Sequence, residues 1–301
     1  MRQREHENLP LLALQILVDG FAISALYGLG AVGFTLIFGV SGVLNLAHGG
    51  IMTVAALVGW WVAAEHGAGP YGSAALGVAA AVVASFVTYY VSIRPIQRSR
   101  AIPAEEEEIF ILTSTLLWGV MLQVGLDYVF TNNPVTMLPL LPGVVQVAGV
   151  RTPKNEVLIA IVCWAIIGVL SLLVNRTRIG KQLLAASINP RALTLLGFEL
   201  SHIYLVVWAI YGFLAGVAGV LLATFLGVSA DTSGALTASA FTIVILGGLG
   251  SVPGSLVAAY VVGYAETITA YLIAPTLRPI PALVLLIIVL YVRPQGLLGR
   301  R

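Results

Sequence analysis

The stretch VLIAIVCWAIIGVLSLLV, at residues 157–174, holds eighteen residues and no charged side chain. A helix needs about 20 apolar residues to cross the hydrocarbon core of a bilayer, because every backbone polar group must be satisfied within the segment. Glu156 precedes the stretch, and Asn175 and Arg176 follow it directly. The stretch is therefore typical of a transmembrane helix.

The whole chain shares this apolar character. Of its 301 residues, 59% are hydrophobic and only 9% are charged, against about 25% charged in an ordinary soluble domain. Lysine and arginine total 15 and the acids total 13, so charge of both signs is scarce. A mean hydropathy of +0.99 excludes a soluble enzyme and a disordered chain. A dispersed net charge of +2 gives no basic face for nucleic acid.

Several other apolar stretches predict transmembrane helices, and some of these stretches are short. Four resemble 157–174 in length and flanks, at residues 71–93, 109–130, 203–225 and 254–273. Two more, at 235–249 and 279–292, are short for a full crossing and predict half-helices or tilted pieces.

Residues 9–64 are the least regular part of the sequence, with only Asp19 and His48 as ionisable interruptions. They hold either two long spans or three short ones. Their glycines indicate breaks and close helix contacts rather than one continuous rod. These glycines are Gly28, Gly30, Gly33, Gly39, Gly42, Gly49 and Gly50. The predicted fold is an all-α, polytopic transmembrane helical bundle of about eight to ten spans with glycine-broken helices.

Lysine and arginine favour the cytoplasmic ends of spans. Three crossings in 9–64 give ten in total, with both termini inside and 12 of the 15 cations in cytoplasmic segments. Only Arg151, Lys154 and Arg278 then fall outside. Two crossings in 9–64 would move the N-terminus alone to the other side. In both cases we expect the C-terminus and the loop at 175–202 to be cytoplasmic.

That loop, NRTRIGKQLLAASINPRALTLLGFELSH, combines cations with apolar residues. Gly180 can open a first short helix, and Asn189 followed by Pro190 fits the N-cap and first position of a second. Gly197 suits the left-handed position that ends it. The loop is either an amphipathic connector on lipid headgroups or a docking element whose apolar residues fill a groove on another protein.

The stretch GVLNLAHGG, at residues 42–50, places polar residues in apolar sequence. Asn45 and His48 are costly at membrane depth unless they face protein or water, which makes them functional candidates. Gly49 and Gly50 permit a non-helical break that lines a cavity. The alternative is a satisfied turn at the inner membrane interface.

A glycine-rich stretch, LGGLGSVPGS at 246–255, separates two apolar segments. A phosphate-binding loop needs a lysine followed by serine or threonine. Lys154 and Lys181, the two lysines of the chain, precede Asn155 and Gln182. The sequence therefore excludes ATP binding by that loop. Gly212 and Gly216 form a small-xxx-small pattern that predicts helix packing.

Three stretches together resemble the permease subunits of ABC importers for branched-chain amino acids, in particular the H-type, high-affinity Leu/Ile/Val permease family. GVLNLAHGGIM, at 42–52, is similar to that family's Asn-x-Ala-His-Gly signature. Residues 177–198 resemble its coupling loop. Residues 247–254 and the closing RPQGLLG, at 293–299, are similar to its glycine-rich and C-terminal patterns.

The resemblance implies a single permease domain over 1–301, multi-pass in the cell inner membrane, that forms half of a translocation pathway. It implies no enzyme activity and no cofactor in this chain. The expected partners are a second, M-type permease, two ATP-binding subunits that hold ATP and Mg²⁺, and an external or periplasmic substrate-binding protein.

The resemblance also implies two sets of site residues. The coupling set is Gly180, Lys181, Ala185, Ala186, Asn189, Arg191, Leu196 and Gly197. The helix-break and pathway candidates are Asn45, His48, Gly49, Gly50, Gly247, Gly248, Gly250 and Gly254. Alternative functions are a permease for urea, short amides or other amino acids, an ion-gradient-driven secondary transporter, and a passive channel or scaffold.

Overall fold

The computed structural model describes residues 2–99, 101–103, 105–130, 133–147, 149–293 and 295–299, with side chains from residue 11 onward. Its elements follow one another as α1 (Arg2–Ser41), α2 (His48–His66), α3 (Pro70–Thr88), η1 (Tyr89–Ile93), α4 (Arg94–Arg98), α5 (Glu107–Val129), β1 (Val144–Val147), β2 (Val150–Pro153), α6 (Lys154–Arg176), α7 (Arg178–Ile188), α8 (Pro190–Leu195), α9 (Leu200–Ala223), α10 (Thr232–Gly247), α11 (Val252–Leu272), η2 (Pro275–Leu277) and α12 (Ile280–Val292).

Seven helical segments of the described chain are long and apolar enough to cross a membrane: α1, the run from α3 to α4, α5, α6, α9, α11, and η2 with α12. This number is below the eight to ten that we predicted. The difference lies in α2 and α10, which pack in the same bundle. Helix α2 has 19 residues but carries polar His48, Glu65 and His66 at its ends, and α10 has only 16 residues.

Helix α1 corrects one expectation. It is continuous for 40 residues, so Gly28, Gly30, Gly33 and Gly39 do not break it, and residues 9–64 form two helices rather than three. Instead, glycines of α1 allow close contact with neighbouring helices. A Cβ at Gly33, for example, would lie 3.2 Å from Leu214 Cβ of α9. The break comes only at Gly42, whose φ of +68° suits glycine.

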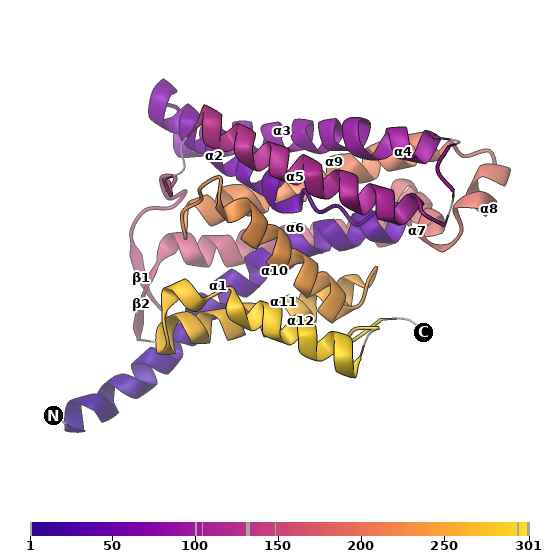
Figure 1. Ribbon diagram of the computed structural model, residues 1–301. Helices are drawn as coiled ribbons and strands as arrows, with labels where there is room; N and C mark the ends of the chain where they lie inside the picture. The colour runs from indigo at the N-terminus through magenta and orange to yellow at the C-terminus, as the bar shows by residue number, and fades with distance from the viewer. Residues whose placement is uncertain are drawn as a thin grey trace.

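The two ends of the bundle carry different elements (Figure 1). The N-terminus and the β1–β2 hairpin lie at one end, and α7, α8 and the C-terminal residues lie at the other. The described ends of the chain are thus on opposite faces of the bundle, which agrees with two crossings in 9–64 and not with three. The hairpin is a small antiparallel exception to the all-α prediction, with Val147 paired to Val150.

Helix α1 is the centre of the bundle. Of the 18-residue apolar stretch that makes each helix long enough to span, 83% is buried in α1, against 17% in α5 and 22% in α6. Helices α5 and α6 therefore lie at the periphery. Trp208 and Tyr211 of α9 and Phe34 of α1 are the largest fully buried side chains. Cys163, the single cysteine of the chain, is on α6 and is also fully buried.

Glycines let α9 approach its neighbours closely. A Cβ at Gly216 would lie 2.9 Å from Ala81 Cβ, and one at Gly212 would lie 2.3 Å from Ser85 Oγ, both on α3. The predicted packing role of this pair is confirmed. Gly219 is tighter still, because its Cβ would lie 2.1 Å from the carbonyl oxygen of Met52 on α2.

We expect Gly219→Ala to lower the free energy of unfolding by about 1–3 kcal/mol, because a backbone oxygen must move to admit the methyl group. Gly168→Ala on α6 is the matched control, since a Cβ there meets nothing within 4 Å, and it should be neutral or stabilising by up to about 1 kcal/mol. Thermal unfolding of the two variants in detergent measures the difference, and equal midpoints would contradict the packing role.

Candidate functional site

The loop predicted to couple to a partner forms two short helices at one end of the bundle (Figure 1). Thr177 is the N-cap of α7, and its side chain accepts a hydrogen bond from the Gly180 amide at 3.0 Å. Helix α7 therefore begins at Arg178, two residues before the predicted opening at Gly180. Asn189 caps α8 by accepting from the Ala192 amide at 3.0 Å, with Pro190 at the first position.

The chain leaves α8 through Gly197, whose φ is +86°. The Phe198 amide then donates to the Leu193 carbonyl at 3.2 Å, which satisfies the end of the helix. The predicted caps at Asn189 and Gly197 are confirmed as local structure. They define a pair of short helices with one exposed face.

The structure divides the coupling residues into two faces. Gly180 and Ala186 are buried and Ala185 is half-buried, and a Cβ at Gly180 would lie 2.2 Å from the Leu173 carbonyl oxygen of α6. The remaining members face outward and are exposed: Lys181, Asn189, Arg191, Leu196 and Gly197. One face therefore anchors α7 on the bundle, and the other is free.

Asn45 and His48 lie together in the core, not at a surface turn. Both are fully buried, and both reach the hydroxyl of Tyr211 on α9: Asn45 Nδ2 donates to it at 2.9 Å, and His48 Nδ1 shares a hydrogen bond with it at 3.0 Å. The Tyr211 hydroxyl makes both bonds at once when it accepts from Asn45 Nδ2 and donates to His48 Nδ1. Sequence reasoning missed Tyr211, because one tyrosine in an apolar span gives no signal.

His48 Nε2 is buried and makes no hydrogen bond among the described residues. It borders a small cavity of about 10 Å³ between α1, α2 and α10, which the side chains of Tyr27 and Ser239 also line. Behind that cavity, Tyr27 donates to Glu266 Oε2 at 2.7 Å and Ser239 to Oε1 at 3.3 Å. The cavity thus lies between two separate sets of hydrogen-bonded polar groups.

Gly49 and Gly50 are not a helix break, which corrects the prediction. They lie in the first turn of α2. A Cβ at Gly49 would lie 2.0 Å from the Ser233 carbonyl oxygen on α10, and one at Gly50 would lie 3.3 Å from Leu122 on α5. These glycines therefore bring the start of α2 against α10 and α5, and the unwound residues are those just before, at 42–47.

The second glycine-rich stretch does separate two helices. Helix α10 ends at Gly247, and Gly248 and Gly250 adopt φ of +100° and +80°. Gly254 lies instead in the first turn of α11, where a Cβ would be 2.1 Å from the Gly247 carbonyl oxygen.

The last described residues pack on that turn. The Leu297 amide donates to the Leu246 carbonyl at 2.7 Å, and the Leu298 amide donates to the Gly247 carbonyl at 3.1 Å. The C-terminal segment thus occupies the end of α10, a contact that the sequence patterns at 247–254 and 293–299 gave no reason to expect.

A larger groove, of about 260 Å³, opens between the start of α2, the middle of α5 and the first turns of α10. Its walls include Leu116 and Val120 of α5 and Phe241 of α10, with Gln123 and Thr237 as polar members. It is larger than the 10 Å³ cavity beside His48.

Comparison with known proteins gives the class to which this bundle belongs. The family model described as "Branched-chain amino acid transport system / permease component" matches residues 16–292. The chain belongs to this family: it is a multi-pass membrane permease component of a transport system, not an enzyme.

Individual relatives match over nearly the whole length. The high-affinity branched-chain amino acid transport system permease protein BraD of Pseudomonas aeruginosa is 30% identical over 294 residues, covering 95% of this chain and 96% of that protein. The corresponding protein LivH of Escherichia coli K12 is 28% identical over 301 residues, with the same coverage. The solved structure of PsaBC from Streptococcus pneumoniae in complex with Fab shares the fold, with a TM-score of 0.54, 14% identity and coverage of 98% of this chain and 97% of that one.

We expect Tyr211→Phe to destabilise the protein by about 1–3 kcal/mol, because it leaves buried Asn45 Nδ2 and His48 Nδ1 without their common partner. Tyr128→Phe is the control, since Tyr128 is 92% exposed. The midpoint of thermal unfolding in detergent measures the effect. A Tyr211→Phe variant as stable as the control would show that this hydroxyl does not hold α2 on α9.

Proposed function

We propose that this chain is one permease subunit of an ABC importer for branched-chain amino acids, moved by a separate ATPase that binds α7 and α8. One observation carries the proposal: a capped helix pair presents apolar side chains outward at the end of a membrane bundle whose sequence has no phosphate-binding loop.

The exposed face of this helix pair fits a protein partner better than lipid headgroups. Leu195, Leu196 and Ile188 are 88%, 74% and 72% exposed. The apolar residues that face the bundle, Leu183 and Leu193, are already buried in it. These exposed side chains therefore lie at the outer end of the helix pair, where an apolar groove on another protein would bury them.

The distribution of cations supports one assignment of the membrane sides. Seven lie at the end that holds α7 and α8, and three more stand within eight residues of one of these in the sequence. The seven are Arg94, Arg98, Arg176, Arg178, Lys181, Arg191 and Arg293, and the three are Arg100, Arg300 and Arg301. The opposite end has five: Arg2, Arg4, Arg151, Lys154 and Arg278. The positive-inside rule favours a cytoplasmic location for α7, α8 and the C-terminus, with the N-terminus outside.

In the proposed assembly this chain pairs with an M-type permease in the cell inner membrane, and an external binding protein delivers the substrate. Two ATP-binding subunits hold ATP and Mg²⁺, so this chain itself needs no cofactor. Closure of those subunits would push α7, which contacts α6, α1 and α9, and α8, which contacts α7 and α9. The turns at Gly42 and at Gly248 and Gly250 are the points where helices could change angle.

Reconstitution tests the proposal. The chain should transport leucine into proteoliposomes only when the second permease, the ATPase subunits, ATP and the loaded binding protein are all present. Uptake driven by an ion gradient without ATP would instead identify a secondary transporter, and uptake of urea but not leucine would identify a different substrate class.

We expect Gly197→Val to weaken binding of the ATPase subunits, because a β-branched residue is strained at φ +86° and opens the end of α8. Gly67→Val is the matched control: Gly67 also ends a helix with positive φ, also has free space around it, and lies at the other end of the bundle. Co-purification of the ATPase with each variant measures the effect.

A second variant tests the same surface without straining the backbone, so that a loss of binding is not caused by misfolding. Leu195→Ser keeps the backbone and removes one exposed apolar side chain, so it should also reduce co-purification. If Gly197→Val, Gly67→Val and Leu195→Ser all retain the ATPase as the unaltered chain does, the coupling role of α8 is wrong.

A further inference from the structure

Two buried carboxyl groups meet where α6 begins, at the end of the bundle that holds the β1–β2 hairpin (Figure 1). Asp19 of α1 and Glu156 of α6 are each only 6% exposed. The side chain of Glu156 lies within hydrogen-bonding reach of the Asp19 carboxyl group. A buried carboxylate is costly without a partner, and two such charges side by side repel each other. One of the two groups therefore needs either a cation or a proton.

The hydrogen bonds identify Asp19 as the charged member of the pair. Gln15 Nε2, one turn earlier on α1, donates to Asp19 Oδ1 at 2.7 Å, and the Tyr271 hydroxyl of α11 donates to Oδ2. Hydrogen bonds to a carboxylate stabilise its ionised form. Glu156 lacks such support, because its Oε2 is buried and has no hydrogen-bond partner among the described residues. Glu156 is therefore the member that must be neutral.

The cations on the adjoining elements do not neutralise the pair. Arg151 of β2 and Lys154 of α6 are exposed. The Lys154 side chain extends along the hairpin, where its Nζ lies 3.7 Å from the position of a Cβ at Gly143. The electrostatic neighbours described for Glu156 and Tyr271 include no lysine or arginine.

The other titratable groups of this region are engaged elsewhere. Glu266, the second buried carboxyl group of α11, accepts hydrogen bonds from α1 and α10. Arg278 interacts electrostatically with Glu266, and the Tyr264 hydroxyl donates to the Leu17 carbonyl at 3.1 Å. Within the described part of the chain, a proton is thus the group that can complete the pair.

We propose that Asp19 and Glu156 form a binding site for one proton, and that this proton fastens the start of α6 to α1 and α11. With the proton on Glu156, its O–H donates to the Asp19 carboxylate, and the pair carries a single negative charge. Without the proton, two carboxylates repel each other and the start of α6 is released from α1. A metal cation fits less well, because both Asp19 oxygens already accept hydrogen bonds. The inference does not depend on the proposed function.

The site makes stability depend on pH with a definite sign. Free carboxyl groups are ionised above about pH 5, so the unfolded chain releases the proton that the folded pair retains. Stability must then decrease as the pH rises through the range in which the folded pair keeps this proton.

Glu156→Gln tests the site, because its amide N–H can donate to Asp19 in place of the O–H and needs no proton. The measurement is the thermal unfolding midpoint of the full chain in detergent between about pH 5 and about pH 7. We expect the midpoint of the unaltered chain to fall with rising pH. The fall in Glu156→Gln should be smaller by about 5 °C, which corresponds to one proton over this range. Asp19→Asn, whose amide can donate to Glu156, should remove the same share.

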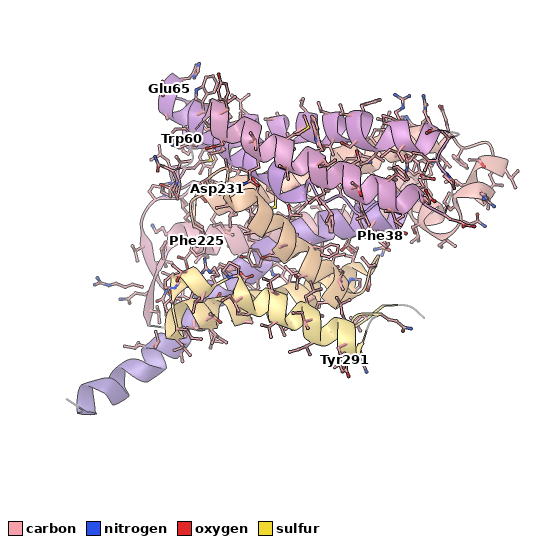
Figure 2. The ribbon with its side chains drawn as sticks, in the orientation of Figure 1. Phe38, Trp60, Glu65, Phe225, Asp231 and Tyr291 are labelled. Atoms are coloured by element: carbon pink, nitrogen blue, oxygen red, sulfur yellow. The ribbon has the colours of Figure 1, made fainter. Side chains whose placement is uncertain are left out.

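Glu65→Gln is the matched control, since it removes an exposed carboxyl group that Figure 2 shows at the end of α2. Its midpoint should fall with pH as much as that of the unaltered chain. Glu266 is present in all of these variants, so its own contribution cancels in the comparison.

Infrared spectroscopy detects the proton directly, because a protonated carboxyl group and a carboxylate absorb at different frequencies. The difference spectrum between the unaltered chain and Glu156→Gln at about pH 7 should contain the band of a protonated acid. The same difference for Glu65→Gln should contain carboxylate bands, as for a free glutamate at this pH.

Two results would overturn the proposal. Carboxylate bands in the Glu156→Gln difference, or an undiminished fall of its midpoint with pH, would show that both groups are ionised. A midpoint of the unaltered chain that calcium chloride raises more than sodium chloride of equal ionic strength, with no such gain in Glu156→Gln, would identify a metal site instead.

Discussion

The structure depends on how a short unwound segment is satisfied inside an apolar bundle. Residues 42–47 leave the helical conformation between α1 and α2, and polar backbone groups at that depth need partners from protein. The Leu46 amide donates to Thr115 Oγ1 of α5 at 3.2 Å, and the Ala47 amide donates to Asn45 Oδ1 at 3.0 Å. Asn45 in turn is held by Tyr211. The segment therefore joins α5 and α9 to the start of α2.

That junction places the start of α2 against two neighbouring helices. With α2 beginning in the middle of the bundle, its first glycines can approach α10 and α5, and the groove lies directly beside them. The far end of α10 is then closed by the glycine turn and by the C-terminal segment. Helices α7 and α8 lie at the same end of the bundle as that turn (Figure 1).

The spans and the helix caps could be predicted from the sequence, because they depend on neighbouring residues in the chain. Apolar runs with charged flanks located five spans, and the order Asn189-Pro190 located the cap of α8. The sequence could not separate two roles of glycine. Gly33 and Gly49 allow neighbouring helices to approach closely, whereas Gly42 and Gly248 adopt positive φ where the chain turns. Only the φ values and the neighbouring helix distinguish them. Tyr211 and Thr115 were out of reach for a different reason, since their partners are 166 and 69 residues away along the chain.

The position of Cys163 makes the protein convenient for spectroscopic work. It is the single cysteine of the chain and is fully buried on α6, so a water-soluble maleimide has little access to its thiol in the folded state. A cysteine introduced at an exposed position could then carry a fluorophore or a spin label without first removing the native one. Pairs of such labels on α8 and α10 would report the distance between these two helices.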